Sequence, residues 1–241
     1  MTIEPIAYFQ SPFPTKFGIP RQSGLVDSLT GRVVFTPPYR QAEAVRGLEG
    51  FDYVWLIWGF TNSRHPSPTT AVTSADDTAA ATARLTVRPP RLGGNERVGV
   101  FASRSPFRPN GLGLSAVKLL SIAADGSLLV GGADLMDGTP VYDVKPYVPY
   151  ADAHPDARGG FTDQRQWQPL TVDFSHCTVD ATPQWLDTLR DVLSQDPRPH
   201  YHDEPQRIYG MVFDNCDVRF QVADHVLTVL SIIKILGKNR K

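Results

Sequence analysis

Short apolar, β-branched segments separated by glycine and proline dominate the first two thirds of the chain, and this pattern limits the folds open to it. Residues 53–60 (YVWLIWGF) are aromatic and β-branched, and the run is too short for an ordinary helix. Residues 97–101 and 115–122 have the same character, and the second run reaches an Ala-Ala-Asp-Gly turn that predicts a hairpin returning over 127–131. With 19 glycines and 21 prolines, the pattern predicts a mainly β barrel or sandwich and not alternating βαβ units.

A change in composition divides the chain into two predicted domains. Residues 151–168 are rich in glycine, aspartate and glutamine, so we expect domains at 1–155 and 169–241. Residues 62–83 are small, polar and low in complexity, which is typical of a mobile surface insertion. The best early helix is a short one over 41–48.

The second domain carries a clear helix signal. Thr182 is an expected N-cap, and Pro183 occupies the first helical position. The leucine spacing that follows predicts a helix over 183–194, and the prolines after Asp196 end it. Strands are expected at 207–213, 218–222 and 226–235. The domain is therefore expected to be a small α+β unit.

The termini and the two cysteines exclude several classes of protein. The first residues lack the basic and apolar regions of a signal peptide, and the apolar stretch 226–236 is too short for a membrane span. Cys177 and Cys216 lie far apart without partners at metal-ligand spacing, which favours two reduced thiols and no metal site. We therefore expect a cytoplasmic protein that does not enter a membrane.

The net charge of −1 does not indicate a nucleic-acid-binding protein, but the distribution of charge is uneven. Six arginines lie between Arg84 and Arg108, against one acid, Glu96. Such a stripe can supply phosphate contacts that release condensed counterions. A solvated face and a site for an anionic cofactor are the alternatives.

Residues 111–116 (GLGLSA) match the dinucleotide-binding pattern G-x-G-x-x-A. That pattern binds pyrophosphate only where a strand turns into a helix. Here a Pro-Arg loop precedes it and a hairpin is expected after it, so we reject a Rossmann site. The preceding loop is more informative, because Pro106 and Pro109 stiffen the segment that carries Arg104 and Arg108. Rigid guanidinium groups lose little entropy when they bind a carboxylate or phosphate.

Two further segments are candidates for ligand binding. Asp137-Gly-Thr-Pro140 is a tight turn in which Gly138 permits close approach of a ligand to the backbone. Asp143 and Lys145 follow on one face of an expected strand, where a charge pair without function is the alternative. Residues 20–22 (PRQ) form another rigid basic loop.

Together these segments resemble the TsaA-like family, whose characterised bacterial members are the TrmO tRNA (adenine-N6)-methyltransferases. The matching segments are IAYFQSPFPTKFGIPRQSGLV, QAEAVRGLEGF, TVRPPRLGGNERVGVFASRSPFRPNGLGLS, DGTPVYDVKPYVPYAD and DPRPHYHDEPQRIYG. Their order and spacing agree over nearly the whole chain.

The resemblance implies a single-sheeted β-barrel catalytic domain, a small C-terminal domain, a homodimer, and S-adenosylmethionine as methyl donor. It implies a substrate as well, N6-threonylcarbamoyladenosine next to the anticodon of a threonine tRNA, which is methylated on N6. Carried over residue by residue, it places the donor at Pro20, Arg21, Gln22, Thr61, Asn62, Arg104, Leu114, Asp137, Gly138, Thr139 and Pro140.

The sequence departs from the family at three places. Thr61 and Asn62 stand where the family often has a His-Gln or similar polar pair, so an amide remains and the histidine is missing. The insertion 62–83 is longer than the family leads us to expect. Residues 110–113 read Asn-Gly-Leu-Gly instead of Asn-Pro-Ile-Gly, which makes that loop less rigid.

The acceptor nitrogen in such a substrate is urea-like and weakly nucleophilic, so its proton must leave. Asp143 or Tyr147 is the expected base or hydrogen-bond partner, and proximity without a base is the alternative. A competing function is a non-catalytic RNA-binding or regulatory barrel that retains the fold, and methyl transfer to another acceptor is a third.

An anticodon loop is single-stranded, so aromatic and arginine side chains can hold its unstacked bases. The candidate contacts to tRNA are Arg108, Lys145 and Arg198. For Arg198 a structural role is the alternative, in which it pairs with Asp196 or Glu204 and joins the two domains.

Overall fold

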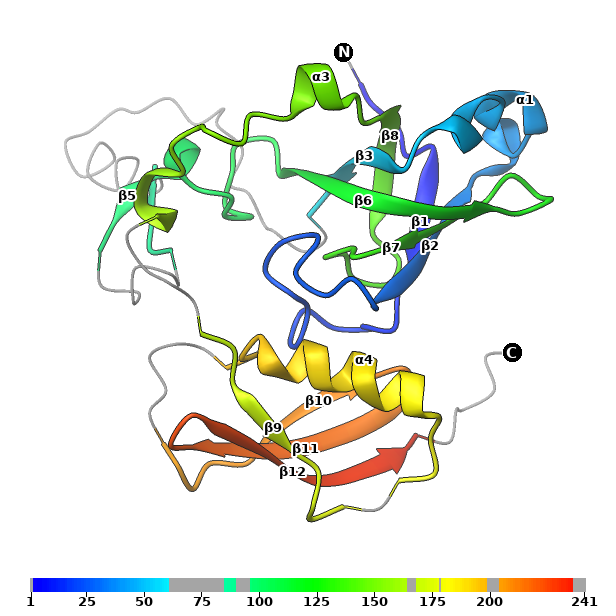
Figure 1. The fold of residues 1–241 in the computed structure, drawn as a ribbon. Coiled ribbons are helices and arrows are strands. Elements are labelled where there is room, and N and C mark those ends of the chain that lie inside the picture. Colours follow the sequence, from blue (N-terminus) through cyan, green and yellow to red (C-terminus); the bar gives the residue numbers. More distant parts are fainter. Residues whose placement is uncertain are drawn as a thin grey trace.

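The computed structural model describes residues 2–60, 85–89, 96–163, 168–177, 179–198 and 204–235. They form two units, a β-barrel and a smaller α+β unit that lies against one side of it (Figure 1). Thr61, Asn62 and the expected insertion 62–83 lie outside these residues.

Six antiparallel strands form the barrel, and each strand pairs with two neighbours, so the sheet closes on itself (Figure 1). The strands are β1 (Ala7–Gln10), β2 (Thr30–Phe35), β3 (Tyr53–Gly59), β6 (Leu112–Ile122), β7 (Leu128–Gly131) and β8 (Pro140–Pro146). Their order around the ring is β1-β2-β7-β6-β3-β8. The mainly β class is confirmed, and most of the segment that matches the dinucleotide pattern lies inside β6, where no helix follows it.

The interior of the barrel follows from the two-residue period of its strands. On β3, Val54, Leu56 and Trp58 are buried and alternate with partly or largely exposed side chains. On the paired strand β6, Ser115 and Val117 are buried at 1% exposure each. The strands therefore enclose a mainly apolar core, in which the Ser115 hydroxyl is a buried polar group.

Short helical turns cap the barrel. The expected helix over 41–48 is limited to α1 (Ala42–Val45), because the chain leaves the helix at Arg46 and Gly47 adopts a φ of 85°. The remaining turns around the barrel are η1 (Pro37–Tyr39), η2 (Leu48–Gly50), α3 (Pro149–Asp152) and η5 (Gly160–Thr162).

The segment expected to be a strand over 97–101 is shorter than predicted. Only β5 (Val98–Gly99) is extended, paired with β4 (Thr86–Val87), and the chain then turns into η4 (Val100–Ala102). Val100 is buried, so one side chain of the turn anchors the segment that leads to Arg104.

The second unit packs one helix on a four-stranded sheet in the order β10-β11-β12-β9 (Figure 1). Its elements are β9 (Thr171–Asp173), α4 (Pro183–Ser194), β10 (Tyr209–Phe213), β11 (Cys216–Ala223) and β12 (Val226–Lys234). The predicted helix is confirmed at both ends, and the Thr182 hydroxyl accepts a hydrogen bond from the Trp185 amide at its N-terminus. The three strands expected here are confirmed, and β9 was not predicted.

Two tight turns connect the last three strands. Asp214 and Asn215, and then Asp224 and His225, have φ values between 45° and 65°, which are left-handed. Two such residues in a row are typical of the type I′ hairpin, whose twist matches that of the strands. Both cysteines are free and partly buried. No helix in the described ranges is long and apolar enough to cross a membrane.

The core of the second unit includes residues from the first. After β1 the chain leaves the barrel, and Phe13, Val26 and Leu29 pack with Leu189 of α4 and Phe220 of β11. The loop 11–29 therefore serves both units, although the sequence led us to expect a simple division between residues 155 and 169. This loop carries the Pro-Arg-Gln segment of the expected donor site.

Candidate functional site

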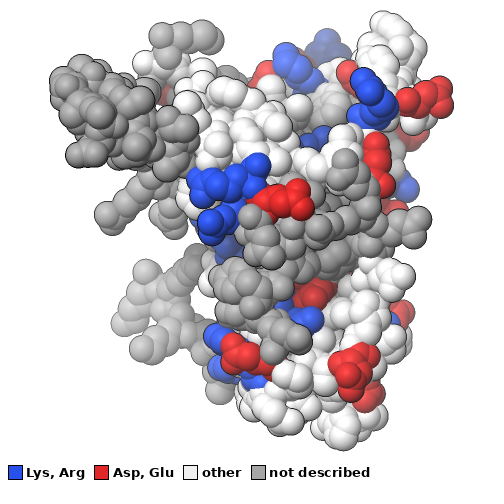
Figure 2. All heavy atoms as spheres, turned by 90° about the vertical axis from the view of Figure 1, so that its left-hand side faces the viewer, with Lys and Arg blue, Asp and Glu red and all other residues white. Residues whose placement is uncertain are grey.

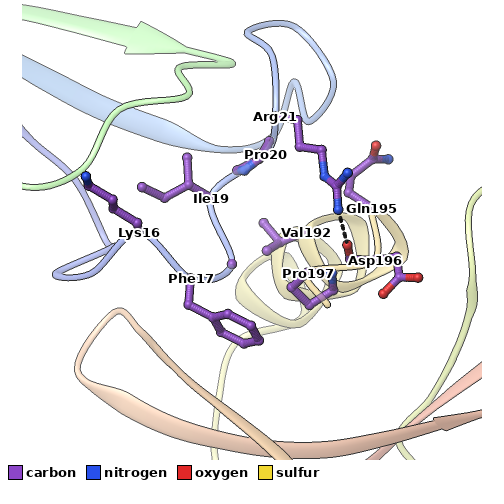
Figure 3. A pocket seen from close by; sticks show the side chains of 10 residues that line it. Lys16, Phe17, Ile19, Pro20, Arg21, Val192, Gln195, Asp196 and Pro197 are labelled. Atoms are coloured by element: carbon purple, nitrogen blue, oxygen red, sulfur yellow. Dashed lines mark hydrogen bonds between the residues drawn. The ribbon is translucent and has the colours of Figure 1, made fainter. Parts of the chain in front are cut away.

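The loop 11–29 holds Arg21 against the second unit. Just beyond the end of α4, its guanidinium donates a hydrogen bond to the carbonyl oxygen of Asp196 at 3.4 Å (Figure 3). It donates a second one to the carbonyl oxygen of Arg198 at 3.1 Å. Residues 16–21 and the end of α4 enclose a cavity of about 200 Å³ there. Pro20 is buried and lines that cavity. The cavity is smaller than a typical ligand pocket and does not include Gln22 or Arg104, so we interpret it as a gap between the units.

Gln22, the next residue, points in another direction. Its side-chain oxygen accepts a hydrogen bond from Arg104 Nη1 at 2.5 Å, although 82 residues separate the two in the sequence. Arg104 is exposed, so its guanidinium has a fixed partner and is still accessible to a ligand. The structure thus brings together two of the residues expected to bind the donor.

A third polar side chain, Asp134, completes this arrangement and was not predicted. Its Oδ1 accepts a hydrogen bond from Ser115 Oγ at 2.6 Å, and the same hydroxyl accepts one from Trp58 Nε1 at 3.0 Å. Burial raises the pKa of the Asp134 carboxyl above its usual range, and the Ser115 hydroxyl, the positive charge of Arg104 and the Ser23 amide oppose that rise. The only signal in the sequence was an acid three residues before the Asp137 turn.

Glycine makes the inner part of this arrangement possible. A Cβ on Gly113 would lie 2.3 Å from the Trp58 ring, so only glycine lets the indole lie against β6 at this point. The ring also packs edge-on against Phe60, with 4.4 Å between the centroids. The second glycine of the rejected dinucleotide pattern therefore has a packing role.

The turn expected to contact the donor is built by its own side chains. Asp137 accepts a hydrogen bond from the Ser11 amide at 3.1 Å, and the Thr139 hydroxyl donates to the Met136 carbonyl at 2.7 Å. Gly138 is exposed with a φ of 74°, a conformation that favours glycine. Pro140 then begins β8. In this turn, Gly138 is the position most accessible to a ligand.

Leu114 and the candidate base lie on the outer face of the barrel. Ile57 of β3 pairs with Leu114 of β6 on one side and with Asp143 of β8 on the other, so the three form one row across the sheet. Leu114 is 55% exposed. Asp143 Oδ2 lies 3.2 Å from Lys145 Nζ, so the charge pair considered as the alternative to a functional role is present and partly exposed.

Tyr147, the other candidate, belongs to an aromatic group on the same face. Its ring lies 5.5 Å from that of Trp55 and 6.1 Å from that of Tyr53, centroid to centroid. The Trp55 indole donates to Asp152 at 3.0 Å. Tyr150, beside Asp152, is 93% exposed.

The two arginines proposed to contact tRNA have partners within the chain. Arg108 donates to the carbonyl oxygens of Val100 and Ser103, which closes its own loop. The Arg198 guanidinium makes two hydrogen bonds to Asp196, at 2.9 and 3.0 Å, and both side chains are largely buried. The structural alternative for Arg198 is therefore the one that the geometry supports.

Charge on the visible surface is mixed. Figure 2 shows basic and acidic side chains interspersed over the face that includes the β5 segment, with no continuous basic field on the described residues. On this face, a polyanion would meet a few separate cations among acidic side chains. Among the residues that the structure describes, no three His, Cys, Asp or Glu side chains converge as metal ligands would.

The polar groups at this end of the barrel fit S-adenosylmethionine in chemical terms. The amino-acid end of that molecule carries a carboxylate, which suits the accessible Arg104 guanidinium. Its ammonium group is a cation, which suits the side-chain carbonyl oxygen of Gln22.

A closed six-stranded barrel with an Arg–Gln–Asp arrangement at one end, followed by a small α+β unit, defines a class distinct from the doubly wound nucleotide-binding folds. Two family models match the chain: the tRNA-methyltransferase O N-terminal domain over residues 8–153 and the TrmO C-terminal domain over residues 167–235. The chain belongs to the tRNA-methyltransferase O family.

Individual relatives agree with this assignment. The Escherichia coli tRNA (adenine(37)-N6)-methyltransferase is 39% identical over 241 residues, which cover 95% of this chain and 96% of the relative. A Pseudomonas aeruginosa protein whose name includes S-adenosylmethionine-dependent methyltransferase is 41% identical over 227 residues, 91% of each chain. The crystal structure of TrmO from P. aeruginosa matches with a TM-score of 0.72 and 34% identity, over 97% of each chain.

Proposed function

We propose that this chain transfers a methyl group from S-adenosylmethionine to N6 of the adenosine at position 37 of tRNA, the position named for its E. coli relative. The observation that carries the proposal is the hydrogen bond from Arg104 to Gln22, close to Asp134. It lies at one end of a barrel that matches the N-terminal domain of this family. When bound, the donor supplies an electrophilic methyl carbon on a positively charged sulfur.

The side chains of the barrel supply orientation and a proton acceptor. Arg104 and Gln22 hold the amino-acid end of the donor, and Gly138 allows its remaining part to approach the backbone. Asp143 lies on the outer face in one row with Leu114, where its carboxylate accepts the proton that leaves N6 as the methyl group bonds to the nitrogen. Lys145, 3.2 Å away, holds that carboxylate in place.

The proposed acceptor is N6-threonylcarbamoyladenosine in threonine tRNA. Its adenine is held in a single-stranded loop, so a flat aromatic group on the protein can stack on it. Tyr53, Trp55 and Tyr147 form such a group beside Lys145, and Lys118 lies opposite Tyr53 in the strand register. The proposed reaction belongs to the cytoplasm, where tRNA is modified.

The proposal includes a homodimer. Several apolar side chains between residues 85 and 114 are more than half exposed: Leu85, Phe101, Phe107 and Leu114. Apolar side chains gathered in one segment are typical of a surface that a partner covers. Sedimentation equilibrium of the purified chain tests this part independently of activity, and a monomer at micromolar concentration contradicts it.

A transfer assay with purified components tests the reaction. Donor labelled in its methyl group is incubated with the chain and with threonine tRNA that either carries or lacks the threonylcarbamoyl group. We expect label only in the modified tRNA, and Asp143→Asn should lower kcat while donor affinity stays unchanged. Donor binding without transfer to any tRNA would instead support the non-catalytic RNA-binding barrel.

A further inference from the structure

We propose that Asp134 is a positioning residue of the donor site, whose carboxylate ties Ser115 of the barrel to the loop 11–29 and whose charge orients the Arg104 guanidinium for donor binding. The proposal rests on the proposed function and adds to it a residue that contacts no reacting atom. It begins from an unusual feature of the barrel, a carboxylate at the edge of a mainly apolar interior.

Three segments that are far apart in the sequence meet at this carboxylate. Ser115 donates to it from β6 at 2.6 Å, the Ser23 amide donates to it from the loop 11–29, and the positive charge of Arg104, in the loop after η4, lies near enough to act on it. Arg104 in turn donates to Gln22 on the loop 11–29. The carboxylate therefore links both loops of the donor site to a strand of the barrel.

The orientation of Asp134 is itself fixed. Trp58, which is 7% exposed, donates to Ser115 Oγ at 3.0 Å, so the hydroxyl hydrogen is directed to Asp134. Two other acids lie in this region: Asp137 accepts from the Ser11 amide, and Asp27 lies beside Gly132. Among the described residues, Arg104 is the cation whose charge acts on Asp134.

Burial makes this carboxylate unfavourable for stability. Because burial raises its pKa, folding favours the protonated acid, and the ionised form opposes folding at neutral pH. A charge that lowers stability and yet acts on Arg104, the partner of Gln22, is typical of a functional site, where stability is given up for a required geometry. A purely structural carboxylate would have the opposite effect on stability.

The chain contains a matched control for this arrangement. Asp125 accepts a hydrogen bond from Ser127 Oγ at the same 2.6 Å, and Arg32 donates to that hydroxyl as Trp58 does to Ser115. Asp125 lies in the exposed β6–β7 hairpin. The two serine hydrogen bonds lower the pKa of its carboxyl, so its charge supports the fold.

The test compares Asp134→Asn with Asp125→Asn in the full-length chain. For Asp134→Asn we expect a Kd for S-adenosylmethionine raised roughly tenfold or more by calorimetry, as for loss of a charged partner. The KM for tRNA should stay unchanged, and the melting temperature without donor should be equal or higher. For Asp125→Asn we expect unchanged donor affinity and a slightly lower melting temperature.

A pH series provides a second, independent readout. Donor affinity of the wild-type chain should fall as the pH is lowered through the raised pKa of Asp134, and Asp134→Asn should abolish that dependence. Ser115→Ala removes a hydrogen bond that lowers this pKa. In that variant, the loss of donor affinity on acidification should therefore occur at higher pH.

The outcomes separate this proposal from the one that it rests on. Absence of donor binding by the wild-type chain overturns both. Wild-type binding together with normal binding by Asp134→Asn overturns only the role of Asp134. Two results together also overturn it in favour of a structural role. They are a lower melting temperature of Asp134→Asn, and a fall in donor affinity at low pH whose midpoint Ser115→Ala does not move.

Discussion

Arg21 Nη2 donates a hydrogen bond to the carbonyl oxygen of Arg198 at 3.1 Å, so the loop that carries Gln22, a proposed donor-site residue, is tied to the C-terminal unit. The Arg198 side chain is bound in turn to Asp196, which has a left-handed φ of 49°. The short segment after α4 is thus held in an unusual conformation by one ion pair, and the loop 11–29 binds to that segment.

Arg198→Ala should therefore destabilise the chain and leave its electrostatic affinity for tRNA unaltered. Removal of one partner from a largely buried pair costs about 3 kcal/mol, so the variant should melt at a lower temperature. A phosphate contact predicts a different result: the log–log salt slope of tRNA binding would fall by about one unit, with little change in melting. Both quantities are measured on one preparation.

Arg104→Ala should weaken binding of S-adenosylmethionine by about 1.5–3 kcal/mol, because it removes a charged hydrogen-bond donor from the site. Arg46→Ala is the control, since Arg46 is exposed and pairs with Glu43 on α1. Calorimetry gives both affinities. Equal affinities of the folded variant and the wild-type chain would place the donor elsewhere.

Local signals in the sequence predicted the elements that local interactions determine. Thr182 and Pro183 define the start of α4 without help from the rest of the fold, and the structure places the helix at 183–194. The hairpin at Gly126 was predicted for the same reason. In contrast, β9 has three residues and exists because β12 offers it a parallel edge, so no periodicity could reveal it.

Contacts between distant segments could be predicted only in part. Arg104 and Gln22 were placed together by family resemblance, and the structure adds their hydrogen bond. Asp134 was missed because its significance depends on Ser115, a serine with no distinguishing neighbours in the sequence. Phe13 and Leu29 belong to the N-terminal part of the chain but pack in the core of the second unit. This assignment depends on tertiary packing, which composition does not reveal.

Acidification should release Trp55 from Asp152. The Val148 amide and the Trp55 indole hold the pKa of the Asp152 carboxyl below its usual range. Because the folded-state pKa is lowered, the contact is complete above the usual range and is lost as pH falls through the lowered pKa. The fluorescence difference between the wild-type chain and Trp55→Phe should therefore change only at strongly acidic pH. A change near neutral pH would show that another group controls this contact.

Mass spectrometry of digested tRNA from a deletion strain and its parent tests the central claim most directly. We predict that the parent contains the N6-methylated form of threonylcarbamoyladenosine, and that the deletion strain contains only the unmethylated form. The wild-type chain should restore the methylated nucleoside and Arg104→Ala should restore less of it. Equal amounts of the methylated nucleoside in the two strains would contradict the account.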